Sequence, residues 1–149
     1  ITSSGVINQV ADPPYYVLID RALRDEGTSY HYLAPTQYVD IAPEMLARFA
    51  DLKKNFQPPL YQGTCWTTDA PFRETQSAIE AAAAEGILAV EMESAALYAF
   101  SLAKNKPVIC FAQVTNQMAV VDGDFEKGAF GGSLAALELI GTLVKTWES

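Results

Sequence analysis

Two patterns of apolar residues divide the 149-residue chain into expected strands and helices. β-branched, aromatic or continuously apolar runs predict strands at residues 1–10, 28–33, 60–68, 86–90 and 108–115. Apolar residues at helical spacing, or a helix-forming composition, predict helices at residues 15–26, 43–54, 78–85, 94–104 and 129–147. Start and stop signals accompany the helices: Pro43 suits a first helical position, and Gly27 and Gly86 follow helical segments as stops.

The order of these elements predicts an α/β fold. Strands that alternate with helices indicate a mixed, largely parallel central sheet flanked by helices, in three α/β/α layers. Neither a repeat nor a linker divides the chain, so residues 1–149 are expected to form a single domain. The chain opens on Ile1 without an initiator methionine, and we expect the domain to be incomplete at its N-terminus.

Composition narrows the expected partners and the compartment. Half of the residues are hydrophobic and 19% are charged, which suits a folded core. The net charge of −8 without a cationic cluster argues against nucleic acid, and no apolar run is long enough for a bilayer. Cys65 and Cys110 lie in apolar runs, and His31 is the only histidine. We therefore expect reduced thiols in a cytoplasmic protein and no metal site.

The segment AVEMESAALY, residues 89–98, places two carboxylates where a strand is expected to give way to a helix. Glu91 and Glu93 flank Met92 at this switch, and ligand crevices of open α/β sheets lie at such strand ends. A carboxylate there can accept hydrogen bonds from two sugar hydroxyls. The residues alone leave a second interpretation open, in which one carboxylate caps the helix and the other lies in solvent.

Polar groups also lie at the predicted carboxyl ends of other strands. They are Thr67, Thr68 and Asp69 with Phe72 and Arg73, then Thr115, Asn116 and Gln117, and a further candidate group of Thr2, Ser3 and Ser4. Strand ends on one side of a sheet converge on one crevice. There, an aromatic ring offers a face to a flat heterocycle and an arginine offers forked donors, so sugar and base together indicate a nucleoside.

Structural interpretations compete with each of these roles. Asp69 suits a turn or a helix cap, and Arg73 suits a surface ion pair with Glu74. His31 between two tyrosines is more typical of a structural residue. The acidic residues from Asp122 to Glu126 lack the remaining ligand spacing of a calcium loop.

The motifs resemble one family. EMESAALY at residues 91–98 is similar to the ribose-binding signature of the nucleoside phosphorylase superfamily, which includes uridine phosphorylases, hexameric purine nucleoside phosphorylases and related nucleosidases. GTCWTTDAPFRET at residues 63–75 resembles its base-side segment. ITSSGVINQV at residues 1–10 resembles the strand that follows its phosphate-binding segment. The resemblance runs through all 149 residues in order.

The resemblance implies roles for individual residues. Glu93 is expected to accept hydrogen bonds from the ribose 2′- and 3′-hydroxyls, and Met92 to pack against the sugar. Glu91 is expected to contact the ribose or to support the site. On the base side, Thr68, Phe72 and Arg73 are expected to contact the substrate, although Pro71 occupies a place where the family more often has an aromatic residue.

Asn116 departs from the purine enzymes of this family, which carry Ser-Asp where this chain has Thr115-Asn116. An amide can hydrogen-bond a leaving base but cannot protonate it. Uridine-phosphorylase-like members also lack the acid, because uracil leaves as a stabilised anion. The resemblance therefore favours a pyrimidine nucleoside, with Asn116 beside the leaving base.

The family's phosphate-binding glycine and arginines precede the point where this chain begins. We expect that missing N-terminal part to supply the phosphate site, and the chain without it to expose an unpaired apolar sheet edge. The expected activity is phosphorolysis of a ribonucleoside by a dimer or hexamer, with inorganic phosphate as co-substrate and no cofactor. A hydrolytic nucleosidase and a non-catalytic nucleoside-binding protein are the alternatives.

Overall fold

A computed structural model describes residues 1–149 except 50–55, 57–58, 115–132 and 149. The strands are β1 (Thr2–Val6), β2 (Tyr15–Asp25), β3 (Tyr38–Asp40), β4 (Leu60–Thr68), β5 (Ala89–Glu91) and β6 (Phe111–Val114). The helices are α1 (Pro43–Arg48), α2 (Gln76–Ala84), α3 (Ser94–Lys104) and α4 (Ser133–Glu148), with short 3-10 helices η1 (Thr28–His31) and η3 (Pro71–Arg73). Within these ranges no helix has the length and apolar composition needed to cross a membrane.

The described strands form one mixed sheet that closes on itself. Its order is β3-β2-β4-β5-β1-β6, and β6 pairs back onto β2. Strands β2, β4 and β5 run parallel, whereas β1 is antiparallel to β5 and β6 is antiparallel to β2. The mixed α/β class is therefore confirmed. The expected three-layer sandwich with a largely parallel sheet is corrected to a mixed sheet that is partly a closed barrel.

Closure also changes the expected sheet edge. Strand β1 is paired on both sides, with β5 and β6, and β6 is paired with both β1 and β2. Among the described strands only the short β3 lies at an end of the sheet order without a second partner. The expectation of an exposed apolar edge is thus wrong for the strands that the structure describes.

The first predicted helix, residues 15–26, is instead the longest described strand, β2. Every residue from Tyr15 to Ile19 is buried, and the strand pairs with β4 on one side and with β6 and then β3 on the other. A strand enclosed in this way favours aromatic and β-branched residues on both faces, as YYVLI provides. The helix-forming composition of RALRDE is overridden by this pairing.

The predicted strand at residues 28–33 is also wrong, because this segment forms η1. Glu26 is buried, and its carboxylate accepts the backbone N–H of Ser29 at 3.0 Å. The N–H groups of Tyr32 and Leu33 in turn donate to the carbonyl oxygen of Ser29. These local bonds satisfy the backbone as a tight turn and leave no ladder for a strand.

Most other predicted elements agree with the structure to within a few residues, but β3 was not predicted and α1 ends at Arg48, earlier than the predicted residue 54. Residues 50–54 and 129–132 of the predicted helices lie outside the described residues. Strand β4 has the predicted bounds, and Gly86 follows α2 with a φ of 76°, the left-handed conformation that glycine adopts readily.

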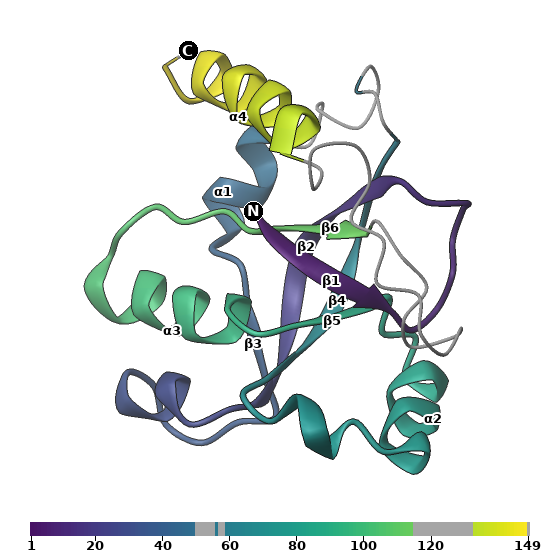
Figure 1. Ribbon diagram of the computed structural model, residues 1–149. Helices are drawn as coiled ribbons and strands as arrows, with labels where there is room; N and C mark the ends of the chain where they lie inside the picture. The colour runs from purple at the N-terminus through teal and green to yellow at the C-terminus, as the bar shows by residue number, and fades with distance from the viewer. Residues whose placement is uncertain (50–55, 57–58, 115–132, 149) are drawn as a thin grey trace.

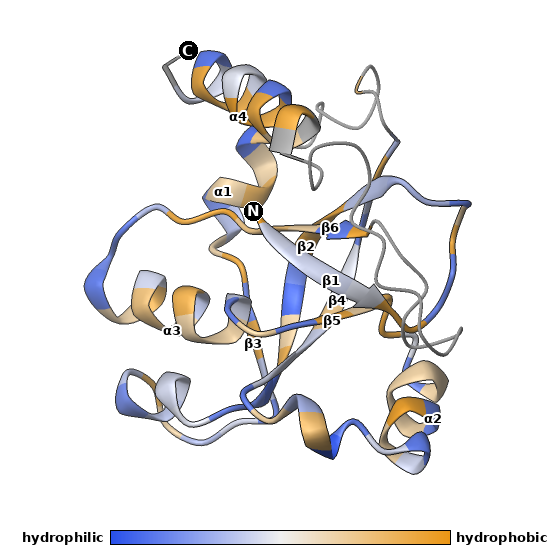
Figure 2. Ribbon diagram, in the orientation of Figure 1, coloured by the Kyte–Doolittle hydropathy of each residue, from blue (hydrophilic) through white to orange (hydrophobic). Residues whose placement is uncertain are grey.

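Helix α4 differs from the prediction in its packing. Of its predicted apolar stripe only Leu143 is buried, together with Leu139, and the other members are exposed: Leu134, Leu137, Ile140 and Val144. Figure 2 shows the mixture of hydrophobic and hydrophilic positions along α4.

Helices cover the closed sheet on several sides, with α3 and η1 together on one side and α1 beside α4 (Figure 1). The ring of Phe49 lies 5.8 Å from that of Trp147, which joins the ends of α1 and α4. Tyr98 of α3 enters the seam between β2 and β6: its hydroxyl donates to the carbonyl oxygen of Ile19 at 2.5 Å and accepts the N–H of Cys110 at 3.1 Å. This bridge fixes α3, and with it the β5–α3 turn, against the barrel.

Candidate functional site

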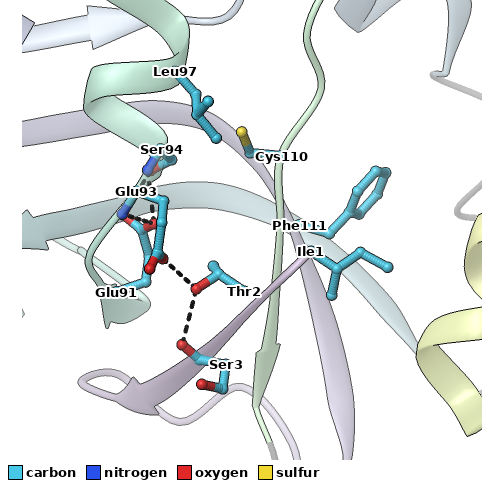
Figure 3. Close-up of a pocket in the computed structure, with 9 residues that line it drawn as sticks. All are labelled: Ile1, Thr2, Ser3, Glu91, Glu93, Ser94, Leu97, Cys110 and Phe111. Carbon is cyan, nitrogen blue, oxygen red and sulfur yellow. Dashed lines mark hydrogen bonds between the residues drawn. The ribbon is translucent and has the colours of Figure 1, made fainter. Parts of the chain in front are cut away.

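A pocket of about 350 Å³ opens beside the turn from β5 into α3 (Figure 3). Its wall comes from the start of β1 (Ile1, Thr2, Ser3), the turn (Glu91, Glu93), the start of α3 (Ser94, Leu97) and the entry to β6 (Cys110, Phe111). Because β1 is antiparallel to β5, the amino end of β1 meets the carboxyl end of β5. Thr2 and Ser3 therefore reach the site from the start of a strand, not from a carboxyl end as the sequence predicted.

Glu93 presents its carboxylate to this pocket. The residue is the N-cap of α3, and its side chain is exposed and points towards Thr2 (Figure 3). One carboxylate oxygen, Oε2, accepts the hydroxyl of Thr2 and the backbone N–H of Met92. Among the described residues, none donates a hydrogen bond to Oε1. This oxygen is open to a ligand, which fits the sugar-binding role predicted for Glu93.

Glu91 lies deeper, with only 2% of its surface exposed. Its Oε1 accepts the hydroxyls of Thr67 at 2.5 Å and Ser94 at 2.6 Å. Its Oε2 accepts the backbone N–H groups of Glu93 at 2.9 Å and Ser94 at 2.8 Å. The charge is thus compensated by donors from β4 and from the start of α3, which offsets the cost of burying it.

The part of the pocket wall formed by Ile1, Leu97, Cys110 and Phe111 is apolar apart from the thiol of Cys110. Cys110 is 5% exposed, and burial, followed by the nearby charge of Glu91, raises the pKa of its thiol to about 12. Cys110 is therefore a neutral, unreactive thiol at physiological pH, as expected for a reduced structural cysteine. Leu97 and Phe111 complete a surface that can pack against the carbon atoms of a sugar ring.

The match to known families decides the classification. Residues 1–137 match the phosphorylase superfamily. The chain belongs to this superfamily. No curated protein shows significant sequence similarity to it.

Solved structures of similar fold agree with this classification. Uridine phosphorylase from Vibrio fischeri ES114, in complex with 6-hydroxy-1-naphthoic acid, superposes with a TM-score of 0.75 at 20% identity over 96% of this chain and 61% of that one. A second structure of that enzyme gives 0.68 at 20% identity over 76% and 48%. AMP nucleosidase from Bacteroides thetaiotaomicron VPI-5482 gives 0.69 at 21% identity over 95% and 62%. This phosphorylase superfamily chain thus spans about half to three fifths of the length of these proteins.

The base-side segment that the superfamily resemblance predicted lies apart from the pocket wall. Phe72, on η3, is 98% exposed, and Arg73 beside it is exposed as well. Thr68 is buried, and its hydroxyl accepts the N–H of Ala70 at 3.1 Å. Asp69 accepts the N–H of Gly27 at 2.9 Å, so its carboxylate holds a turn distant in sequence and not the local turn or helix cap that its structural interpretation predicted. The structure does not bring Thr68, Phe72 or Arg73 to Glu93, and their contact with a base stays a prediction.

Met92 is 47% exposed at the edge of the turn and is not part of the pocket wall, although its backbone N–H contacts Glu93. His31 is exposed on η1, away from the pocket wall. Asn116, its neighbours Thr115 and Gln117, and the acidic residues from Asp122 to Glu126 lie outside the described residues. Elsewhere in the described ranges, no three His, Cys, Asp or Glu side chains gather as a metal site would require.

Sequence reasoning missed Ser94, Leu97, Cys110 and Phe111 as residues of the site. Ser94 had a signal, because a serine at the start of a helix often bonds to nearby backbone or side-chain groups. The other three had none. An apolar run such as VICFAQVT is typical of a buried strand, and only its position beside β1 turns Cys110 and Phe111 towards a pocket.

Proposed function

We propose that the protein binds a ribonucleoside at this pocket through its ribose and cleaves the N-glycosidic bond with phosphate. The orientation of Glu93 carries the proposal: an open carboxylate oxygen faces a pocket of about 350 Å³ in a member of the phosphorylase superfamily. Glu93 accepts hydrogen bonds from the ribose hydroxyls, and Met92 packs against the sugar from the edge of the turn, outside the described pocket wall. The fold similarity to uridine phosphorylase and to AMP nucleosidase is consistent with chemistry at a nucleoside.

In the proposed reaction, a phosphate oxygen attacks C1′ of the ribose while the bond from C1′ to the base nitrogen breaks. The electron pair of that bond goes to the base, and the products are ribose 1-phosphate and free base. Positive charge builds on the sugar during this step. Glu93 places negative charge beside the sugar, where it favours such a transition state.

A uridine-like pyrimidine is the proposed base. Asn116 supports this choice, because an amide can stabilise a leaving uracil anion by a hydrogen bond but cannot protonate a leaving purine. The described wall of the pocket has neither lysine nor arginine. We therefore propose that the cations for phosphate come from another part of the polypeptide or from a neighbouring subunit of a homo-oligomer.

The intact protein is assayed for base release from uridine, thymidine, inosine and adenosine, each with and without phosphate. Release that requires phosphate supports the proposal, whereas phosphate-independent release identifies a nucleosidase. Nucleoside binding by calorimetry without release under either condition identifies a non-catalytic binding protein. If none of the four nucleosides binds, the assignment of the pocket is wrong.

The site assignment is tested with Glu93→Ala, which is expected to lower kcat/KM by at least about 10²-fold, since a group that stabilises the transition state is lost. Glu80→Ala is the matched control. Glu80 is an exposed carboxylate on α2, paired with Gln76 and absent from the pocket wall. Equal activity of the two variants would contradict the role of Glu93.

A further inference from the structure

The buried carboxylate of Glu91 has no acceptor position left for a ligand. An ionised carboxylate offers about four lone-pair positions. In Glu91, two are filled by the hydroxyls of Thr67 and Ser94, and two by the N–H groups of Glu93 and Ser94. A sugar hydroxyl could bond to Glu91 only by displacing one of these donors, each of which would then be left without its partner in a buried setting.

The donors of these bonds show what Glu91 holds in place. The N–H groups of Glu93 and Ser94 belong to the residues that begin α3, and a negative charge at a helix N-terminus is stabilised by the helix dipole. The bond to the N–H of Glu93 restrains the peptide from which the Glu93 side chain departs. Oε2 of Glu93 is held separately by Thr2 and by the N–H of Met92. The backbone and the carboxylate of Glu93 are thus fixed by different partners.

Thr67 links the carboxylate of Glu91 to strand β4 of the barrel and lies outside the pocket wall. It is fully buried. Its hydroxyl donates to Oε1 of Glu91 at 2.5 Å and accepts the N–H of Ala95 at 3.1 Å. Residue 67 pairs with residue 91 in the parallel β4–β5 ladder, so the two side chains share one face of the sheet.

We propose that Glu91, held by Thr67, is a positioning residue that orients Glu93 and does not itself contact the nucleoside. This inference rests on the proposed sugar-binding role of Glu93 and deepens it. It replaces the direct ribose contact that the sequence offered for Glu91 with an indirect role. It also assigns a role in substrate binding to Thr67, a residue that the ligand does not reach.

Thr67→Val tests the inference in the intact protein, because valine keeps the shape of threonine and removes the hydroxyl. With the nucleoside most rapidly cleaved in the screen, kcat/KM is expected to fall about 10- to 100-fold, as when a supporting partner of a functional residue is lost. Thr67→Ser, which retains the hydroxyl, is expected to restore activity to within about threefold of wild type. Assays at a temperature well below the unfolding midpoint of every variant separate this loss from unfolding.

A double-mutant cycle with Glu93→Gln separates positioning from a general structural role. If Thr67 and Glu91 act through Glu93, Thr67→Val and Glu91→Gln each cause at most about a twofold further loss when Glu93 is already glutamine. Losses that multiply in the double variants would overturn the proposal. So would a Thr67→Val variant with wild-type kcat/KM beside a strongly impaired Glu91→Gln variant, because Glu91 would then act on the ligand directly.

Failure of the proposed function is distinguished by a readout that needs no substrate. If the wild-type protein cleaves no nucleoside, the amide proton resonances of Glu93 and Ser94 still report on the carboxylate of Glu91. Thr67→Val and Glu91→Gln are expected to shift both resonances, since hydrogen bonds to a charged acceptor are short and strong. Unchanged resonances in both variants would overturn the positioning role independently of catalysis.

Discussion

Tyr98→Phe removes a single oxygen atom from the seam where the barrel closes. The hydroxyl of Tyr98 stands between the carbonyl oxygen of Ile19 and the N–H of Cys110, which face each other at the end of the β2–β6 ladder. The other bond of this residue pair forms directly, from the N–H of Ile19 to the carbonyl oxygen of Cys110 at 3.0 Å. Tyr98 therefore replaces one rung of the ladder and joins α3 to both strands.

The expected loss of stability follows from the two backbone groups, the carbonyl oxygen of Ile19 and the N–H of Cys110, that phenylalanine would leave unpaired. Tyr98 is fully buried, so water cannot easily replace the hydroxyl. A buried polar group left without its partner costs about 1–3 kcal/mol. Because the strands can relax towards each other and recover part of a direct bond, we expect a total loss of about 2–4 kcal/mol in the free energy of unfolding. This is a large fraction of the stability of an ordinary domain.

The assay is equilibrium unfolding in urea, with Tyr16→Phe as the matched control. Tyr16 is also fully buried, but its hydroxyl has no hydrogen-bond partner among the described residues. Removing an unsatisfied buried hydroxyl is expected to be neutral or stabilising. If Tyr98→Phe costs less than about 0.5 kcal/mol, or no more than Tyr16→Phe, the bridging role of Tyr98 is refuted.

Two further predictions concern other buried polar groups. Arg24 is 4% exposed, and its guanidinium donates hydrogen bonds to Ser29, Ala34 and Thr36. Because lysine lacks the planar fork of donors, Arg24→Lys is expected to lower the free energy of unfolding by about 2–4 kcal/mol in the same assay. A loss below about 0.5 kcal/mol would contradict this. Burial is the main cause that raises the pKa of Cys110 from 9.0 to about 12. Between these two pH values the thiol is therefore ionised in the unfolded chain but still protonated in the folded protein. The contribution of this thiol to the free energy of unfolding is fully present below pH 9 and is lost as pH rises towards 12, at a slope of up to about 1.4 kcal/mol per pH unit. Cys110→Ala should flatten the decline measured by unfolding across this range, and an unaltered slope would disprove it.

Prediction of the fold succeeded where residue chemistry forces the local structure. Pro43 begins α1, and Gly86 ends α2 in a conformation that other residues adopt only with strain. It failed at residues 15–26, where YYVLIDRALRDE satisfies a helical spacing and a buried strand equally well. Only pairing with β4, β6 and β3 decides between them, and that pairing joins residues far apart in the sequence.

The direction of β1 explains why part of the site was expected for the wrong reason. The sequence placed Thr2 near Glu93 by assuming that carboxyl ends of parallel strands converge. In the structure Gly5 pairs with Val90 in an antiparallel ladder, so the chain runs from the pocket into the barrel along β1. The polar start of β1 and the polar end of β5 still meet. Strand direction depends on connections between elements, which apolar periodicity does not report.

The two interpretations that the sequence left open for its acidic pair apply to different residues. Glu91 is the last residue of β5 and lies two positions after the fully buried Ala89, so strand alternation turns its side chain towards the interior. There it accepts the N–H of Ser94 and caps α3. Glu93 lies beyond the strand, where alternation no longer applies, and its carboxylate reaches the pocket. One strand period therefore separates the carboxylate that supports the helix from the one available to a sugar. The same period predicts that moving the end of β5 by two residues would place Glu93 in the supporting position, whereas a shift of one residue would place Met92 there.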